Sequence, residues 1–196
     1  VNIFACGHDG ITVAATGPSS GVSNYDSTSY VSNCKGYGIH TGGGIAAVLN
    51  GNTQINSGNG LQIDKASGIS NREIFLGPAF MADSNLGHGV YIAADSISLI
   101  DCSGCWMAGN RGSGISIEGQ GGGTVPAAGT TGQFIGCHSY ANGSTGINIV
   151  NDPGMWLVSG CVLNANLYPI GTANLGTLTV TSNIANGNWH GFSLGA

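Results

Sequence analysis

A four-residue block of the form glycine–apolar–any residue–apolar recurs along the chain and limits its fold more than any other feature. The block begins at Gly10, Gly60, Gly89, Gly114, Gly146 and Gly191, with a weaker copy at Gly38. Because strand side chains alternate between two faces, both apolar residues of a block point the same way. Blocks separated by steps of about 26 residues are typical of a solenoid in which each repeat forms one coil.

Two further marks accompany the block. An asparagine stands four residues before the block glycine in four repeats, at Asn56, Asn85, Asn110 and Asn142. Asparagines stacked in this way hydrogen-bond from one coil to the next. A small residue or a cysteine ends the strand before each block, at Cys6, Cys34, Gly51, Pro78, Cys102, Cys137, Cys161 and Asn183. One coil, near Pro169, is degenerate.

These marks predict an all-β fold, a parallel β-helix (solenoid) of about seven to eight coils, with residues 1–196 forming a single domain. No stretch shows the 3.6-residue period of a helix, and glycine and β-branched residues dominate. The first coil starts close to Val1, and residue 1 is not methionine. We therefore expect the chain to be a fragment of a longer protein.

The composition excludes several classes of function. Charged residues make up 7% of the chain, the net charge is −5, and only four residues are Lys or Arg. A nucleic-acid groove needs clustered basic residues, so nucleic acid is not expected as a partner. No apolar run approaches the roughly 20 residues of a membrane helix, so membrane insertion is not expected. Hydrophobic residues nevertheless make up 41%, enough for a packed core.

Five of the six cysteines, all but Cys105, fall at or next to one position of the repeat. We expect them to stack as a buried ladder of small hydrophobic side chains. Neighbours in the ladder are close enough for a disulfide, although disulfide geometry is demanding. Cys102 and Cys105 have no second pair at zinc spacing, so no metal site is predicted.

The middle residue of each block faces outward and forms one exposed row that includes His40, Gln62, Tyr91 and Asn148. Carboxylates edge the same face where the strands end. Asp64 and Glu118 stand four residues after a block glycine, and Asp95 and Asp152 stand six after one. Asp95, Glu118 and Asp64 are the predicted catalytic residues. Tyr91, Gln62, His40, Asn148 and Asp152 are the predicted substrate-binding residues.

Most glycosidases use two carboxyl groups that flank the bond to be cut. Asp64 and Glu118 are two coils apart, about 10 Å, with Asp95 in the coil between them. Inverting enzymes hold their carboxyls roughly 6.5–9.5 Å apart and retaining enzymes about 5–5.5 Å. The alternative is structural, because an Asp after a strand commonly caps a turn. No cofactor is predicted, and no histidine pair has metal-binding spacing.

The repeated segments at residues 98–117, 133–150 and 50–64 resemble the right-handed parallel β-helix superfamily, which contains pectate-lyase-like enzymes, polysaccharide epimerases and lyases, and bacteriophage tailspikes. The resemblance covers nearly the whole chain and implies the handedness of the coil. A pectate-lyase-type site would use an Asp cluster for calcium with a basic residue. The chain has no matching Arg motif, so no catalytic residue is carried over from that group.

The low charge and the loops rich in Ser, Gly and Asn look more like a tailspike or tail fibre. That resemblance implies a homotrimer in the virion tail, outside the cell, which binds and in many cases cuts bacterial surface polysaccharide. Two alternatives stay open. One is a bacterial polysaccharide lyase or epimerase, and the other is a non-enzymatic adhesin or fibre shaft.

Overall fold

The structure is a computed structural model that describes residues 2–13, 23–25, 30–41, 47–49, 51–64, 72–93, 97–119, 130–173 and 175–195. Every regular element in these ranges is a β-strand. The described residues accordingly contain no helix with the length and hydropathy to cross a membrane.

The strands form three parallel sheets, here called A, B and C. Sheet A contains, in spatial order, β1 (Asn2–Phe4), β4 (Tyr30–Ser32), β7 (Asn52–Gln54), β10 (Met81–Asp83), β13 (Trp106–Ala108), β16 (His138–Tyr140), β19 (Val162–Asn164) and β22 (Ile184–Asn186). Sheet B contains β2 (Ile11–Val13), β5 (Ile39–Thr41), β8 (Leu61–Ile63), β11 (Val90–Ala93), β14 (Ile115–Glu118), β17 (Thr145–Val150), β20 (Tyr168–Ala173) and β23 (Ser193–Leu194). Sheet C contains β3 (Ser23–Tyr25), β6 (Ala47–Leu49), β9 (Arg72–Leu76), β12 (Ile97–Ser103), β15 (Thr131–Ile135), β18 (Met155–Ser159) and β21 (Thr177–Thr181).

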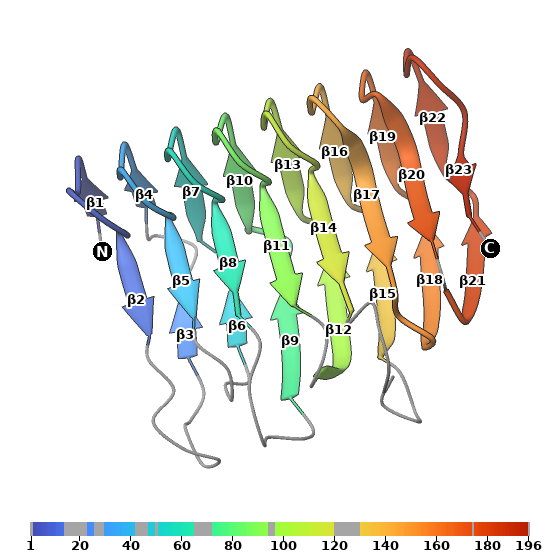
Figure 1. Cartoon of the computed structure of the whole chain (residues 1–196), viewed down its shortest axis with the longest axis horizontal. Coiled ribbons are helices and arrows are strands. Elements are labelled where there is room, and N and C mark those ends of the chain that lie inside the picture. Colours follow the sequence, from blue (N-terminus) through green and yellow to red (C-terminus); the bar gives the residue numbers. More distant parts are fainter. Residues whose placement is uncertain are drawn as a thin grey trace.

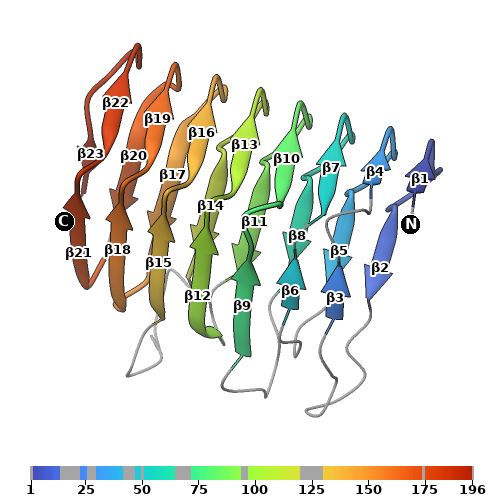
Figure 2. The same ribbon diagram turned by 180° about the vertical axis from the view of Figure 1, so that it is seen from behind.

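Each strand pairs with the equivalent strand of the coil before it and the coil after it. The coils therefore follow one another along the long axis from the N-terminal to the C-terminal end (Figure 1). In the view from behind, the strands of sheet A and those of sheet C both follow one another from the N-terminal to the C-terminal end (Figure 2). The predicted fold class, an all-β parallel β-helix, is confirmed. Pro169 of β20 occupies the place of the block glycine Gly146 of β17, which makes its coil the degenerate one.

The block glycine of one coil packs against the ladder asparagine of the next coil. A Cβ added at Gly89 would lie 2.6 Å from the carbonyl oxygen of Gly114 and 2.8 Å from Nδ2 of Asn110. The same arrangement holds at Gly60, which faces Asn85, and at Gly114, which faces Asn142. Glycine is therefore required because the asparagine of the next coil fills the space of a side chain.

A single residue in the left-handed conformation bends the chain from sheet A into sheet B in each described coil, and the next residue is the ladder asparagine in six coils and a cysteine in the first two. The set is Ala5, Asn33, Ile55, Ser84, Gly109, Ala141, Ala165 and Gly187, with φ between 53° and 64°. Only two of the eight are glycine, although the left-handed region favours it. The bend turns the following side chain inward, where the asparagine ladder forms.

The paired apolar residues of the blocks fill the interior, as predicted. Both members of the pairs beginning at Leu61, Val90, Ile115 and Ile147 are buried. Phe134 of β15 and Trp156 of β18 stack with ring centroids 5.8 Å apart and are also buried. The Trp156 ring occupies the space that a side chain at Gly132 would need. Each buried side chain of this size stabilises the fold by about 1.5–3 kcal/mol.

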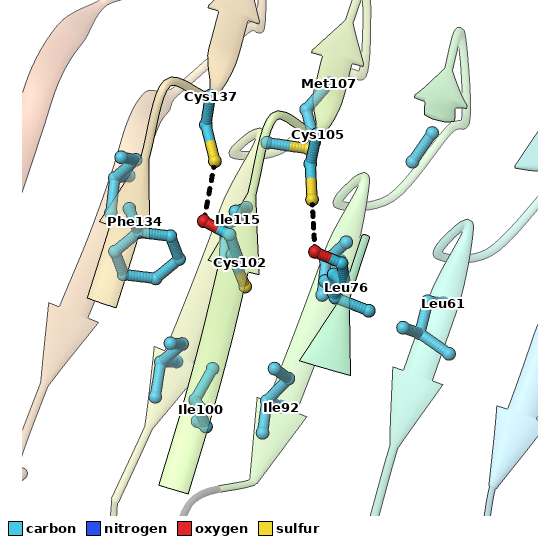
Figure 3. Packing of buried hydrophobic residues seen from close by; sticks show 14 of the residues in the cluster. Leu61, Leu76, Ile92, Ile100, Cys102, Cys105, Met107, Ile115, Phe134 and Cys137 are labelled. Carbon is cyan, nitrogen blue, oxygen red and sulfur yellow. Dashed lines mark hydrogen bonds between the residues drawn. The ribbon is translucent and has the colours of Figure 1, made fainter. Parts of the chain in front are cut away.

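The cysteines form two stacks, not the single ladder expected from the sequence. Cys105, Cys137 and Cys161 stack in the turn from sheet C to sheet A, because the amides of His138 and Val162 bond the carbonyls of Cys105 and Cys137. Cys102 belongs instead to β12. The thiols of Cys105 and Cys137 donate to the carbonyls of Leu76 and Cys102 at 3.1 Å (Figure 3).

The other two cysteines stand where later coils have the ladder asparagine. The amide of Cys34 bonds Oδ1 of Asn56 at 3.1 Å, so Cys34 precedes Asn56 in that ladder. Cys6 follows the left-handed residue Ala5 in the same way as Cys34 follows Asn33. All six cysteines are free thiols.

The stacked thiols are expected to resist alkylation in the folded protein. The neighbouring Cys105 thiol, together with burial, raises the pKa of Cys137 to about 12. At pH 8 only about one ten-thousandth of Cys137 is then the reactive thiolate. Iodoacetamide labelling read by peptide mass spectrometry should modify Cys6, which is half-buried, and should modify the other five only in guanidinium. Labelling of Cys137 in the native protein would contradict this packing.

Candidate functional site

The outer face of sheet B carries the predicted substrate-binding row. The strand register places the middle residues of the blocks side by side, in the order Thr12, His40, Gln62, Tyr91, Ser116, Asn148, Gly171 and Ser193. The face is less open than the alternation of side chains implies. Gln62 is 8% exposed and hydrogen-bonds Asn59 and Asp64, and Ser116 is not exposed and hydrogen-bonds Glu118 and Asn148.

His40 links three coils through two carboxylates. Its Nδ1 lies 2.7 Å from Oδ2 of Asp9, in the turn before β2, and its Nε2 lies 2.7 Å from Oδ2 of Asp64, directly after β8. The backbone amide of Tyr37 donates to Asp9 Oδ1 at 2.8 Å. Nε2 of Gln62 donates to Asp64 Oδ1 at 2.8 Å. Each carboxylate is therefore held at both oxygens.

This arrangement favours an ion triplet. Burial of the His40 ring opposes protonation, but the hydrogen bonds to Asp64 and Asp9 outweigh it and raise the His40 pKa above its ordinary value. Burial of the Asp64 carboxyl acts to raise its pKa. The hydrogen bonds from Gln62 and His40 outweigh burial and lower the Asp64 pKa. Because the His40 pKa rises and the Asp64 pKa falls, both groups are charged at any pH between the two pKa values. Its contribution to stability is lost as pH rises through the His40 pKa or falls through the Asp64 pKa.

A second group of polar side chains continues the row toward the C-terminal coils. Asn59 Nδ2 donates to Gln62 Oε1 at 2.6 Å, and Asn59 Oδ1 accepts the backbone amide of His88, also at 2.6 Å. The His88 ring lies 5.9 Å from the Tyr91 ring, between centroids, and its Nδ1 accepts the amide of Ser113 at 2.9 Å. Burial lowers the His88 pKa. His88 is thus a neutral ring that supports Tyr91.

Tyr91 connects this group to Glu118. Its hydroxyl donates to Glu118 Oε2 at 3.1 Å, and Ser116 Oγ donates to Oε1 at 3.3 Å. Asn148 Nδ2 in turn donates to Ser116 Oγ at 3.1 Å. We call the connected set the polar strip. It consists of Asp9, His40, Asn59, Gln62, Asp64, His88, Tyr91, Ser116, Glu118 and Asn148.

The two described catalytic candidates lie on either side of β11. Asp64 follows Ile63, which pairs with Ile92, and Glu118 pairs with Ala93, the residue after Ile92. Both carboxylates therefore lie at the same level of sheet B, two strand spacings apart, which corresponds to about 10 Å between their backbones. Tyr91 projects from the strand between them.

Asp95 lies outside the described residues. Asp152 is not on the edge of the face, contrary to the sequence-based expectation. It is 3% exposed, and its Oδ1 accepts the amides of Thr130 at 3.1 Å and Gly154 at 2.7 Å. The carboxylate caps the turn between β17 and β18, which is the structural alternative, and a ligand on sheet B has no access to it.

The sequence reasoning overlooked Asp9, Asn59 and His88. All three directly precede a block glycine. That shared position was the available signal, because the chain turns onto sheet B there. In the ranges that the structure covers, no cluster of three or more His, Cys, Asp or Glu side chains is arranged to hold a metal ion.

No protein-family model matches the chain, and neither does any curated protein. Among solved structures, it is similar to the A-module of the mannuronan C-5 epimerase AlgE4 from Azotobacter vinelandii, with a TM-score of 0.66 and 14% sequence identity. The match covers 97% of this chain and 54% of the other, so this chain spans about half the length of that module. At this identity the likeness concerns the fold alone. The chain is a right-handed parallel β-helix.

Proposed function

We propose that the polar strip binds a polysaccharide and that Asp64 and Glu118 hydrolyse a glycosidic bond of it. The observation that carries the proposal is the placement of these two carboxylates at one level of sheet B, with Tyr91 between them. Their backbones are about 10 Å apart. That spacing is compatible with the inverting arrangement, in which the carboxyl groups are roughly 6.5–9.5 Å apart and a water fits between the base and the sugar.

The strip has the chemistry that recognises sugars. From His40 to Asn148 it crosses four strand spacings, about 19 Å, the length of several sugar rings. Carboxylate, amide and hydroxyl groups offer both donors and acceptors to sugar hydroxyls. The Tyr91 ring supplies an apolar surface with a polar tip. Gln62, Tyr91 and Asn148 are therefore proposed to bind the substrate.

Asp64 and Glu118 have different roles in this reaction. Asp64 is the base, since its lowered pKa keeps it ionised, and it removes a proton from the attacking water. Glu118 is the acid and gives its proton to the glycosidic oxygen as the bond from that oxygen to the anomeric carbon breaks. The water oxygen forms the new bond to the anomeric carbon, and the product has a new reducing end.

A second candidate is a polysaccharide lyase or epimerase. It is favoured by the fold similarity to a mannuronan C-5 epimerase module. The three chemistries differ in their products. Hydrolysis gives a new reducing end, a lyase also gives an unsaturated end that absorbs in the ultraviolet, and an epimerase leaves the chain uncut.

We propose that the protein acts as a tailspike-type component of a virion tail, assembled as a homotrimer. The support is the sequence resemblance, together with apolar side chains on the outer face of sheet A, where Phe4, Trp106, Tyr140 and Ile184 are exposed. Sedimentation analysis should give three times the chain mass. A monomer across the micromolar range would contradict the trimer and would leave the site proposal standing.

The test uses purified capsular polysaccharides, lipopolysaccharides and polyuronates. Each is incubated with the protein, and reducing ends, ultraviolet absorbance and the proton spectrum of the polymer are measured. Reducing ends without an ultraviolet signal are the expected result on at least one polymer. Binding without any product would reject the enzymatic proposal and favour an adhesin. An unsaturated product would replace hydrolysis with the lyase reaction.

A further inference from the structure

We infer that Asp9 and His40 are positioning residues that hold Asp64 in one orientation and in its ionised form. The inference rests on the proposed function for its catalytic meaning, because Asp64 is the base of that proposal. It replaces the sequence-based assignment of His40 as a substrate-binding residue.

Both ring nitrogens of His40 hydrogen-bond a carboxylate. Nδ1 and Nε2 each lie 2.7 Å from a carboxylate oxygen, one on Asp9 and one on Asp64. Distances of this length are typical of charge-assisted hydrogen bonds. An imidazolium donates from both nitrogens and accepts at neither, so a ring held in this way has no nitrogen left for a sugar.

The contacts with the His40 ring come from three successive coils. Asp9 precedes β2, His40 lies in β5, and Asp64 follows β8. The Tyr37 ring meets the His40 ring edge-on, with centroids 5.1 Å apart. The titratable groups that face His40 among the described residues are thus Asp9, Asp64 and Tyr37.

Asp9 contributes a negative charge that acts on Asp64 through His40. Its Oδ1 accepts the Tyr37 amide and its Oδ2 faces His40, so it lies behind the histidine as seen from Asp64. Its negative charge favours the imidazolium, and the imidazolium favours the ionised carboxylate of Asp64. The order of the three residues is therefore a relay from Asp9 through His40 to the base.

The experiment compares the wild type with Asp9→Asn and with Asp9→Glu. The matched control is Asp83→Asn, on the outer face of sheet A, where the Ser84 hydroxyl donates to the Asp83 carboxylate at 2.8 Å. Circular dichroism checks the fold. Proton NMR follows the His40 ring through a pH titration. Over the same pH range, hydrolysis is measured on a polymer that the reducing-end assay shows to be cut.

Asp9→Asn is expected to lower the titration midpoint of His40 by about one pH unit or more, since an opposite charge in contact has an effect of this size. At a pH between the wild-type and variant midpoints, where only the wild-type His40 ring is charged, kcat should fall in Asp9→Asn. Asp9→Glu should restore the midpoint and kcat, and Asp83→Asn should change neither. An unchanged His40 midpoint in Asp9→Asn overturns the relay. A shifted midpoint with an unchanged kcat profile overturns the positioning role.

The two proposals fail separately. If no polymer is hydrolysed by the wild type, the proposed function is wrong. The carboxyl carbon of Asp64, followed by NMR in the wild type and in His40→Gln, then decides the inference by itself. Titration of Asp64 at a higher pH in the variant supports the relay, and an unchanged titration overturns it.

Discussion

Replacement of Glu118 with Gln is expected to lower kcat for polysaccharide hydrolysis at least about 100-fold, the lower end of what a general acid contributes. Glutamine has nearly the same shape and keeps one acceptor oxygen, for Tyr91 or Ser116, but it has no acidic proton to give to the leaving oxygen. KM should change little, because the strip that binds the polymer stays intact. Reducing ends formed per unit time at saturating polymer measure the effect.

Asp64→Asn should give a loss of similar size, since an amide does not deprotonate water. Asp83→Asn is the control for loss of a surface carboxylate and should keep wild-type kcat. An Asp64→Asn or Glu118→Gln variant that hydrolyses the polymer at the wild-type rate would show that the reaction does not use this pair. In that event Asp95, which lies outside the described residues, becomes the carboxylate to test.

Asn110→Ala is expected to destabilise the protein by at least about 3 kcal/mol. The Asn110 side chain makes four hydrogen bonds: its Nδ2 donates to Asn142 Oδ1 and to the Ala82 carbonyl, and its Oδ1 accepts from Nδ2 and the backbone amide of Asn85. The site is 1% exposed, so water does not replace these partners. Each buried group left without a partner costs about 1–3 kcal/mol.

Guanidinium unfolding followed by circular dichroism measures this effect. Asn164→Ala is the matched control, because Asn164 is only half-buried on the outer face of sheet A and accepts one hydrogen bond, from the Asn186 amide. The control should shift stability by no more than about 0.5 kcal/mol. Equal unfolding midpoints for the two variants would show that the ladder does not stabilise the coil.

Position along the repeat was enough to predict the parts of the site that lie on strands. Strand side chains alternate strictly, and a parallel register places equivalent residues side by side, so His40, Gln62, Tyr91 and Asn148 follow from the block pattern. The level of Asp64 and Glu118 follows in the same way. The catalytic and binding roles of these residues stay predictions until the assays are done.

Position along the repeat was not enough in the turns. Asp9, Asn59 and His88 reach the strip because the chain bends onto sheet B just before them, and alternation does not apply through a bend. Asp152 shows the same limitation in reverse, since the turn after β17 brings its carboxylate inward to the amides of Thr130 and Gly154. The distance in sequence from a block glycine does not encode either result.

The sequence by itself determined the repeat, the parallel stacking, the inward apolar pairs and the asparagine ladder, because each depends on local alternation and on identical residues meeting in register. Only the tertiary structure decided which cysteines stack, which carboxylates meet His40, and which acids are buried. Those contacts depend on one left-handed residue per bend and on side chains that come from different coils. Neither is visible as a pattern within one repeat.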